Sequence, residues 1–552
     1  MTSVKTGLRL GLLLCVAFAL RAASASYGLP ALYHQDEPMM VNHALAMAAA
    51  HSLHPHYFVI PAFVMEALLV LYALFFAAGK IFGMFHGPRD FALHFLTDPT
   101  PFYFMGRLFI GAAFGTGAVA MVWQAARKFF SEEIAWLAAV FLTVAFLHVK
   151  NSYFIYADPP MTFFTLCFFY AVWRLYDSKT MGWALYSGIF LGLAMATKYN
   201  AVFAAIPALL VYFIFVKGKI GPVLAAVAAA CLVFFALDPY VLLDWSGFLS
   251  TWQSQIRSQT FWGWGYHFKY SLANGLGWPL LSLSLLGFAV WVKRFQREGF
   301  CALGFVVVHY LTCVFLGQPY DRYAVPMVPF LCLSAAFAFS ALFPRRGVIR
   351  LLALVAVIVI PISASEYSGT LLRRADTRTQ CKDWFEKNVE AGTGVALDHP
   401  FFSPRLTPTD DQTRMKAQQA EPDASQRLRW ELETEANAGK KKFHVFYLTR
   451  DAAEHPRFSS AQPALPLDVA SLKRQGVQYV VANYQDANNE VRAFREELLK
   501  NGEIAAVFSP YQDKNKKWSK DWAALTADPV LLEELFSRDA PGPYLEVYRL
   551  HG

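Results

Sequence analysis

Long apolar runs separated by short polar breaks fill the first two thirds of the chain. An α-helix rises about 1.5 Å per residue, so roughly 17–25 apolar residues cross the hydrocarbon core of a bilayer. Eleven runs approach or reach this length, near residues 8–25, 106–125, 134–152, 161–176, 182–197, 200–216, 220–237, 277–292, 300–316, 323–342 and 349–365. The pattern predicts an α-helical polytopic membrane domain of about 11 spans over residues 1–365.

The pattern changes after residue 365, where polar residues become frequent. Residues 366–552 alternate helical signals, at 380–389 and 489–499, with short strand-like runs at 395–397, 443–448, 477–482 and 544–550. A mixture of short helices and strands over this length predicts a small soluble α/β domain. Residues 403–440 could be either an ordered excursion or a flexible insertion, and the sequence does not decide between them.

Composition supports this division. Of the 552 residues 56% are hydrophobic and only 16% are charged, with a mean hydropathy of +0.32, which excludes an ordinary soluble protein. The net charge of +8 comes largely from short loops between apolar runs, so it reports membrane topology and gives no sign of nucleic-acid binding. The seven cysteines show neither a disulfide framework nor metal-ligand spacing.

The positive charges predict how the chain threads the membrane, because cytoplasmic loops carry an excess of Lys and Arg. Six basic clusters lie between the spans, at residues 5–9, 127–128, 174–179, 217–219, 293–297 and 345–350. All six fall on the cytoplasmic side only if a further apolar run, 60–76, does not cross. Pro61 and Glu66 in that run favour a helix along the outer interface. The first outer loop 26–105, the outer loop 237–277 and the soluble domain then all lie outside.

The outer side collects unusual polar residues, of which Asp36 and Glu37 are the most specific. A carboxylate near apolar surface is costly unless it is paired or used, and burial raises its proton affinity toward that of a general base. Catalysis by this pair is one interpretation. The other is a helix start, with Asp36 as N-cap and Pro38 in the first turn.

Asp158 and Lys198 are predicted to lie on the same side. Asp158 precedes Pro159 and Pro160, so it is either a second acid of a site or the cap of the next helix. Lys198 interrupts two apolar runs. A lysine at the outer end of a span runs against the charge bias, which favours a phosphate partner, although such a side chain can also simply reach the interface.

Two arginines at span ends could also bind phosphate. Arg107 opens one predicted span, and Arg322 follows Asp321 at the start of another. Arginine suits bidentate contacts with phosphate, whereas the alternative is a salt bridge inside the helix bundle.

Aromatic residues and histidines complete the list. Trp262, Trp264 and Tyr266 in the outer loop, together with Tyr323, could contact a sugar or a prenyl chain, or form an interfacial aromatic belt. The sequence identifies no certain cofactor and assigns no metal ligands, and it leaves metal dependence open. A divalent metal bound by histidines 54 and 56 with Glu66 is an alternative that the ligand spacing does not support.

The order of these motifs resembles a known family. Asp36-Glu37 after a first span, Asp158 before a span, Thr197-Lys198, Trp278-Pro279 and Asp321-Arg322-Tyr323 with Pro326 together resemble polyprenyl-phosphate-sugar glycosyltransferases of the GT-C type (glycosyltransferase family 39), which include the protein O-mannosyltransferases and aminoarabinose transferases. The resemblance covers roughly residues 8–365.

The resemblance implies an inverting transfer of a sugar from a polyprenyl-phosphate carrier at the outer membrane face. By position, Asp36 would deprotonate the acceptor, with Glu37 beside it and Asp158 as the second acid. Lys198, Arg107 and Arg322 would hold the carrier phosphate. Val59-Ile60-Pro61 replaces the Glu-Lys-Pro of aminoarabinose transferases, and the inserted domains of protein mannosyltransferases are not found, so the acceptor stays open.

We therefore expect a glycosyltransferase, using a hexosyl or pentosyl lipid-phosphate donor and a glycan, lipid or protein acceptor, in a bacterial inner membrane with a periplasmic or extracellular C-terminal domain. The alternative from another class is a polytopic transporter or flippase of a lipid-linked or polar substrate. Transporters place ionisable residues near the bilayer midplane and often contain repeats. Here these residues gather at one face, and the sequence shows no repeat.

Overall fold

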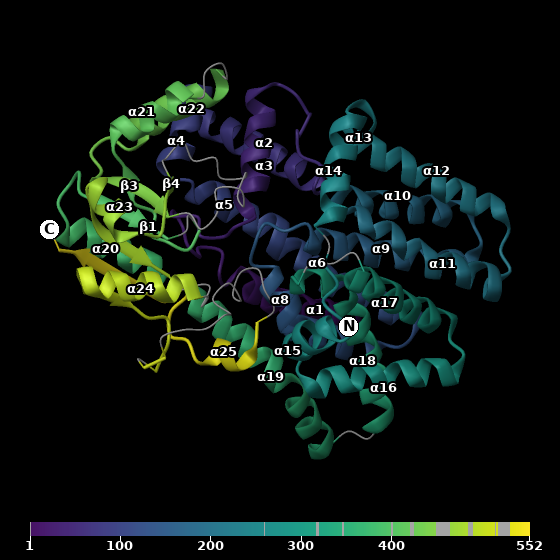
Figure 1. Ribbon diagram of the computed structural model, residues 1–552. Coiled ribbons are helices and arrows are strands. Elements are labelled where there is room, and N and C mark those ends of the chain that lie inside the picture. Colours follow the sequence, from purple (N-terminus) through teal and green to yellow (C-terminus); the bar gives the residue numbers. More distant parts are fainter. Residues whose placement is uncertain are drawn as a thin grey trace.

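Helices dominate the computed structural model, and one sheet lies in its C-terminal region (Figure 1). The structure describes residues 2–258, 260–315, 319–344, 347–398, 401–419, 424–448, 464–483, 489–513, 515–516 and 530–551. The predicted architecture, an α-helical membrane protein with a small C-terminal α/β domain, is confirmed at this level.

The membrane region consists of helices in close succession. They are α1 Thr2–Ala22, α2 Glu37–Ala49, α3 Phe63–Ile81, α4 Pro88–Thr97, α5 Thr100–Gly106, η1 Arg107–Ala113, α6 Phe114–Phe129, α7 Glu132–Val144, α8 Phe146–Asn151, α9 Asp158–Ser178, α10 Met181–Thr197, η2 Tyr199–Ala204, α11 Ala205–Val211, η3 Tyr212–Val216, α12 Ile220–Leu237, α13 Tyr240–Leu243, α14 Trp245–Arg257, η4 His267–Leu272, α15 Ala273–Leu276, α16 Trp278–Arg294, α17 Arg297–Phe315, η5 Asp321–Met327, α18 Val328–Leu342 and α19 Val348–Leu372. Every one of the eleven predicted runs falls on helix.

The number of spans stays a prediction. Among the described residues, seven helices are long and apolar enough to cross a membrane, or eight if the pair on either side of Gly277, bent by 110°, counts as one span. The run predicted over 134–152 is broken at Ala145, between α7 and α8, and α10 is a shorter apolar helix. Such breaks explain why counting apolar runs and counting long helices give different totals.

Helix α3 is the run that charge counting places along the membrane surface. By length and composition it is also able to cross, so its surface position remains a prediction. It packs beside α2 in Figure 1. Val64, Met65 and Leu68 of α3 share one buried apolar cluster with Val41 and Ala44 of α2, so the two helices of the first loop form a single unit.

A buried arginine explains how the chain tolerates the break after α7. The last carbonyls of a helix lack intrahelical partners. Arg21, at the end of α1, donates from Nη2 to the Leu142 carbonyl at 2.9 Å and from Nη1 to the Thr143 carbonyl at 3.2 Å. The break separates α7 from the short helix α8, which leads into the segment that precedes Asp158.

The C-terminal region contains the sheet. Its strands run in the order β2-β3-β1-β5-β7-β6, with β4 paired to β3; β1 is parallel to β3 and β5, and β7 is antiparallel to β5 and β6. The elements are α20 Thr377–Asn388, β1 Gly394–Leu397, β2 Thr407–Pro408, α21 Asp410–Gln419, α22 Ala424–Ala436, β3 Lys442–Leu448, β4 Ala464–Leu465, α23 Val469–Arg474, β5 Val477–Ala482, α24 Asn489–Asn501, β6 Gly502–Phe508, α25 Leu532–Phe536 and β7 Leu545–Leu550.

All six predicted C-terminal elements are present. Strands β4 and β6 and helices α23 and α25 were not predicted, and residues 403–440, which the sequence left open, contain β2 and the two helices α21 and α22. Glu435 of α22 accepts from Arg89 of α4 at 2.6 Å, so this excursion contacts the first loop. The predicted boundary after residue 365 falls inside α19, which continues to Leu372.

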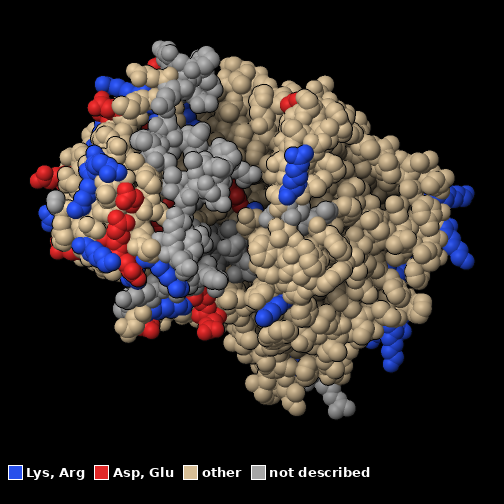
Figure 2. All heavy atoms as spheres, viewed as in Figure 1, with Lys and Arg blue, Asp and Glu red and all other residues tan. Residues whose placement is uncertain are grey.

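Charge is distributed as the sequence suggests. On the face drawn in Figure 2, the C-terminal domain carries both signs, whereas the helical region is almost uncharged apart from scattered Lys and Arg, several of them at the edge far from that domain. The chain is a membrane protein, and its orientation in the membrane stays a prediction from the basic clusters.

Candidate active site

Four chain segments meet at one polar cluster. They are the residues before α2, the residues before α9, the junction of α10 and η2, and the start of η5. Arg322 Nη1 donates to Asp36 Oδ2 at 2.7 Å, and Lys198 Nζ donates to Asp158 Oδ1 at 2.6 Å. Both cations lie near the Tyr323 ring, at 4.1 Å for Lys198 Nζ and 5.8 Å for Arg322 Cζ from its centroid. The structure thus brings five of the predicted site residues together.

The three predicted acids differ in access. The Asp36 side chain is 38% exposed, whereas those of Glu37 and Asp158 are 1% and 3% exposed. A general base must reach the proton it removes. Among these three carboxylates, Asp36 is the one that a molecule outside the protein can reach.

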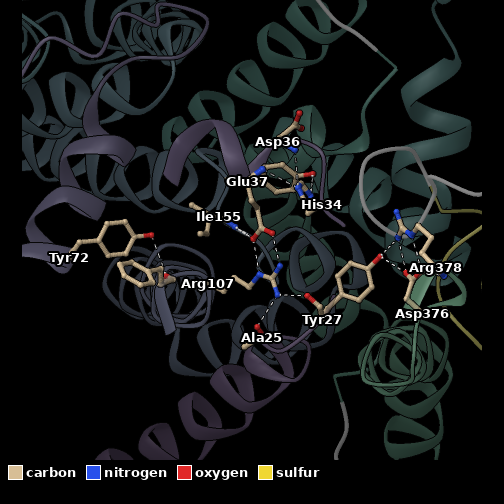
Figure 3. A network of polar contacts seen from close by, with 12 residues as sticks. Ala25, Tyr27, His34, Asp36, Glu37, Tyr72, Arg107, Ile155, Asp376 and Arg378 are labelled. Atoms are coloured by element: carbon tan, nitrogen blue, oxygen red, sulfur yellow. Dashed lines mark hydrogen bonds and ion pairs between the residues drawn. The ribbon is translucent and has the colours of Figure 1, made fainter. Parts of the chain in front are cut away.

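Glu37 forms a buried bidentate pair with Arg107 (Figure 3). Arg107 donates from Nε to Oε1 at 2.8 Å and from Nη2 to Oε2 at 2.6 Å, and its Nη1 donates to the carbonyls of Ala25 and Tyr27. The backbone amide of Ile155 donates to Oε1 at 3.0 Å. This arrangement joins α2, η1 and the segment before α9, and it uses all three nitrogens of the guanidinium. The geometry favours the alternative interpretation of Arg107, a salt bridge in the bundle, over a contact with carrier phosphate.

His34 provides the cap that the sequence assigned to Asp36. Helix α2 begins at Glu37 with Asp36 as N-cap and Pro38 in its first turn, but the Asp36 side chain makes no capping hydrogen bond. The backbone amides of Asp36 and Glu37 donate instead to His34 Nδ1, at 3.1 and 3.2 Å. Because Nδ1 accepts, Nε2 carries the proton and donates to the Tyr156 hydroxyl at 2.8 Å. The Asp36 carboxylate accepts from Arg322 and stays partly exposed.

His34 is held in this neutral state. It is fully buried, and burial lowers its pKa below the ordinary value, against the opposing pull of Glu37 and Asp36. Protonation would turn Nδ1 from an acceptor into a donor and remove the cap. The orientation of the start of α2 therefore depends on an uncharged imidazole.

Arg322 lies among aromatic rings. Its Cζ is 4.4 Å from the ring centroid of Tyr320 and 4.8 Å from that of Tyr156. Within the described part of the chain, its hydrogen bonds come from Nη1 alone, to Asp36 and to the Tyr156 hydroxyl at 3.3 Å. Stacking fixes the plane of the guanidinium, and Nε and Nη2 stay available for an anion.

Asp321, next to Arg322 in the chain, forms a buried ion pair with Lys150. It accepts from Lys150 Nζ at 2.8 Å and from Asn151 Nδ2 at 3.4 Å, and all three side chains are buried. This is the bundle salt bridge that the sequence offered as the alternative for the Asp321-Arg322 motif. Its neighbour Arg322 points instead toward Asp36. In this motif, Asp321 forms the salt bridge of the helix bundle, and Arg322 stays a candidate to bind phosphate.

The predicted aromatic residues of the outer loop make other contacts than those with Lys198 and Arg322. Trp262 and Trp264 are about half exposed, and the Trp264 ring packs against Phe315. The Tyr266 hydroxyl donates to the carbonyl of Pro319 at 3.3 Å. Tyr323 is the predicted aromatic residue that contacts the cations of the site.

The histidines of the first loop are arranged for packing. The rings of His54 and His56 stack with centroids 3.7 Å apart, and His54 Nε2 lies 3.3 Å from Asp244 Oδ2. Across the described ranges, no group of three or more His, Cys, Asp or Glu side chains is placed to hold a metal ion.

Sequence reasoning missed His34, Tyr156 and Tyr320. His34 lies two residues before Asp36, and an imidazole accepting from the amides that open a helix is a local signal that could have identified it. The role of Tyr156 depends on partners more than a hundred residues away in the chain, for which one sequence holds no signal. Tyr320 contacts Arg322 only two residues further on, so its place beside the Asp321-Arg322 motif is a local signal.

Comparison with known proteins supports the family resemblance over part of the chain. Residues 92–248 match the model of the dolichyl-phosphate-mannose-protein mannosyltransferase family. The matched segment contains Arg107, Asp158 and Lys198, whereas Asp36 and Arg322 lie outside it. The resemblance that the motifs indicate is confirmed for this segment. No curated protein matches the chain in sequence.

Two solved membrane proteins are similar to the chain along most of their length. The crystal structure of ArnT from Cupriavidus metallidurans in the apo state is 12% identical, with a TM-score of 0.49 over 92% of this chain and 97% of that one. The apo oligosaccharyltransferase of Archaeoglobus fulgidus is 10% identical, with a TM-score of 0.49 over 98% and 88%. TM-scores below 0.5 are too low for either likeness to carry an argument about this chain.

Proposed function

We propose that this chain is an inverting glycosyltransferase that moves a sugar from a polyprenyl-phosphate carrier to an acceptor hydroxyl or a similar group. The observation that carries the proposal is a single half-exposed carboxylate, Asp36, beside two cations, Arg322 and Lys198, that are fixed in place and still have unused donors. A base and a phosphate site next to each other are what this transfer requires.

The chemistry follows from the leaving group. As the acceptor oxygen attacks the anomeric carbon from the side opposite the phosphate, the bond between that carbon and the phosphate oxygen breaks, and its electron pair stays on the phosphate. Asp36 takes the acceptor proton. Lys198 and Arg322 stabilise the charge that develops on the departing phosphate. A single displacement inverts the anomeric centre.

The other charged residues have supporting roles in this proposal. Asp158 orients Lys198, and the pair of Glu37 and Arg107 anchors the start of α2 so that Asp36 faces the acceptor. Glu37 and Arg107 are therefore proposed as positioning residues, and the catalytic base is Asp36 alone.

The family match supports a lipid-phosphate donor, and the chain alone leaves the sugar and the acceptor open. We further propose that the site faces the outer side of a bacterial inner membrane, with the C-terminal domain on the same side, because the six basic clusters favour that orientation. No specific contact among the described residues favours the transporter alternative.

The test uses the purified full-length protein with a panel of polyprenyl-phosphate sugars and acceptors. Removing a general base lowers transfer by about 10²- to 10⁴-fold, so Asp36→Asn should lose nearly all activity. Asp98→Asn is the matched control, because Asp98 is an exposed acid of the same loop whose carboxylate accepts from the Thr100 amide at 3.0 Å. Undiminished transfer by Asp36→Asn would rule out Asp36 as the base.

A further inference from the structure

The segment that carries Asp36 is attached to the C-terminal domain by two tyrosines, of which Figure 3 shows Tyr27 beside Asp376 and Arg378. The Tyr27 hydroxyl donates to Asp376 Oδ2 at 3.2 Å, and the Tyr33 hydroxyl is 3.0 Å from Thr379 Oγ1. We propose that the start of α20, with Arg378 at its centre, is a positioning element for the Asp36 segment. This inference rests on the proposed function, because it concerns the geometry of the proposed base.

Arg378 contacts both tyrosines. Its Nη2 donates to the Tyr27 hydroxyl at 3.1 Å, and its Cζ lies 4.0 Å from the centroid of the Tyr33 ring. One guanidinium thus fixes a hydroxyl at one end of the segment and a ring at the other. Both tyrosines are 2% exposed, so these contacts are shielded from water and from salt.

Arg378 is itself rigid. It donates from Nε to Asp376 Oδ1 at 2.8 Å and from Nη2 to Asp376 Oδ2 at 2.7 Å, while Nη1 donates to the Phe401 carbonyl at 2.7 Å. Asp376 also caps α20 by accepting from the Arg378 amide at 2.9 Å. The positioning element is therefore part of the folded domain and does not depend on a mobile side chain.

The two attachment points connect directly to the site. The carbonyl of Tyr27 accepts from Arg107 Nη1 at 2.7 Å, which ties this residue to the buried partner of Glu37. Tyr33 precedes His34, whose Nδ1 orients the amides of Asp36 and Glu37. A displacement of Tyr27 would reach Glu37, the neighbour of Asp36, through the two hydrogen-bonded steps at Arg107, and a displacement of Tyr33 would reach Asp36 through three residues of chain.

The backbone between the tyrosines needs such support. Leu32 has φ of 58°, in the left-handed region that residues with a Cβ adopt at a cost. A strained conformation persists only when its surroundings determine it. The contacts at Tyr27 and Tyr33 lie on either side of Leu32, and both come from the C-terminal domain.

Apolar contacts give a second, independent link. Val530 and Leu535, which belong to the C-terminal domain, pack in the same buried cluster as Tyr27, Tyr33 and Tyr156. Tyr156 is the residue that accepts from His34 and contacts Arg322. The C-terminal domain therefore packs against the tyrosines of the Asp36 segment and also against Tyr156, which contacts Arg322.

The experiment compares the double variant Tyr27→Phe/Tyr33→Phe with Tyr544→Phe in the full-length protein. Both remove buried tyrosine hydroxyl contacts and keep the rings, but Tyr544 bonds only within its domain, to Glu546 Oε1 at 3.1 Å. Hydrogen exchange of the peptide 27–37 and the kinetic constants for sugar transfer are measured. We expect exchange about tenfold faster and kcat about tenfold lower in the double variant, with KM for the donor unchanged.

Three outcomes decide the matter. Exchange in 27–37 equal to that of the Tyr544→Phe control would overturn the proposal. Faster exchange with unchanged kcat, in a protein that Asp36→Asn inactivates, would also overturn it, because the segment would then be attached without affecting the base. If Asp36→Asn is fully active, the proposed function fails, and the exchange measurement still decides whether α20 holds the segment.

Discussion

Substitution of the two adjacent carboxylates should have different effects: we expect Glu37→Gln to lower the stability of the protein and Asp36→Asn to abolish sugar transfer. Glu37→Gln keeps the size of the side chain and removes its charge. Arg107 would then be a guanidinium that is 1% exposed, with two backbone carbonyls and a neutral amide as its acceptors. Breaking a buried ion pair by removing one partner costs about 3–5 kcal/mol. The amide group still accepts from Ile155, so this loss comes from the uncompensated charge.

Asp36→Asn removes a pair that is partly exposed. Such pairs contribute about 0–1 kcal/mol, since water screens them and the side chains lose entropy to form them. We therefore expect the stability of Asp36→Asn to lie close to that of the natural chain, while transfer is lost. Glu37→Gln should instead be destabilised by several kcal/mol.

Denaturant unfolding of the purified protein in detergent micelles, followed by tryptophan fluorescence, measures both variants. Glu132→Gln is the matched control, because Glu132 is an exposed acid in the first turn of α7 and surface changes of this kind shift stability by no more than about 0.5 kcal/mol. If Glu37→Gln unfolds at the same denaturant concentration as Glu132→Gln, the assignment of Glu37 to a buried structural pair is refuted. The double variant Glu37→Met/Arg107→Met should recover much of the loss, because it leaves no buried charge.

Two further predictions concern the partners of Asp36. Arg322→Lys keeps the positive charge but loses the planar guanidinium that can bind phosphate through two nitrogens, so the KM for the donor should rise by roughly tenfold. An unchanged KM, measured by titrating the donor, would exclude Arg322 from the phosphate site. His34 resists protonation in the folded protein, and the unfolded chain binds a proton near pH 6.5, so the stability that His34 contributes is complete above that pH and is lost as the pH falls below it. His34→Asn supplies an uncharged acceptor at the same place, and unfolding curves between pH 7.5 and 5 should show a smaller loss for it than for the natural chain.

The sequence predicts the architecture well because its main signals are local. Apolar runs, basic loops and the change in composition after residue 365 each depend on neighbouring residues, and they correspond to the helices and the sheet that are observed. The strand β6 was missed because its residues, Gly502–Phe508, are mostly exposed or half-buried and do not alternate between apolar and polar positions. The break between α7 and α8 was also not predicted, because the carbonyls at the end of α7 are satisfied by Arg21, which is more than a hundred residues away in the chain.

The site is predicted in its residue types and only partly in its pairs. Charge topology predicts that Asp36, Asp158, Lys198 and Arg322 lie on one side of the membrane, and the structure brings these four residues together. A single sequence does not show which carboxylate pairs with which lysine or arginine. Glu37 takes Arg107, and Asp158 takes Lys198, because helix geometry decides the direction in which each side chain points.

The pair Asp36-Glu37 shows how one residue step separates two roles. Glu37 is the first residue of α2 and points into the bundle, where η1 supplies a cation and the segment before α9 supplies an amide. Asp36 lies just before the helix, and His34 accepts from the backbone amides that an Asp36 cap would bind. The Asp36 carboxylate therefore stays partly exposed at the edge of the cluster. In the proposed site, a sequence pattern of two acids followed by proline therefore encodes an anchor, Glu37, next to the proposed base, Asp36. The anchor needs burial and the base needs access, and the start of a helix is a place where adjacent residues can have both.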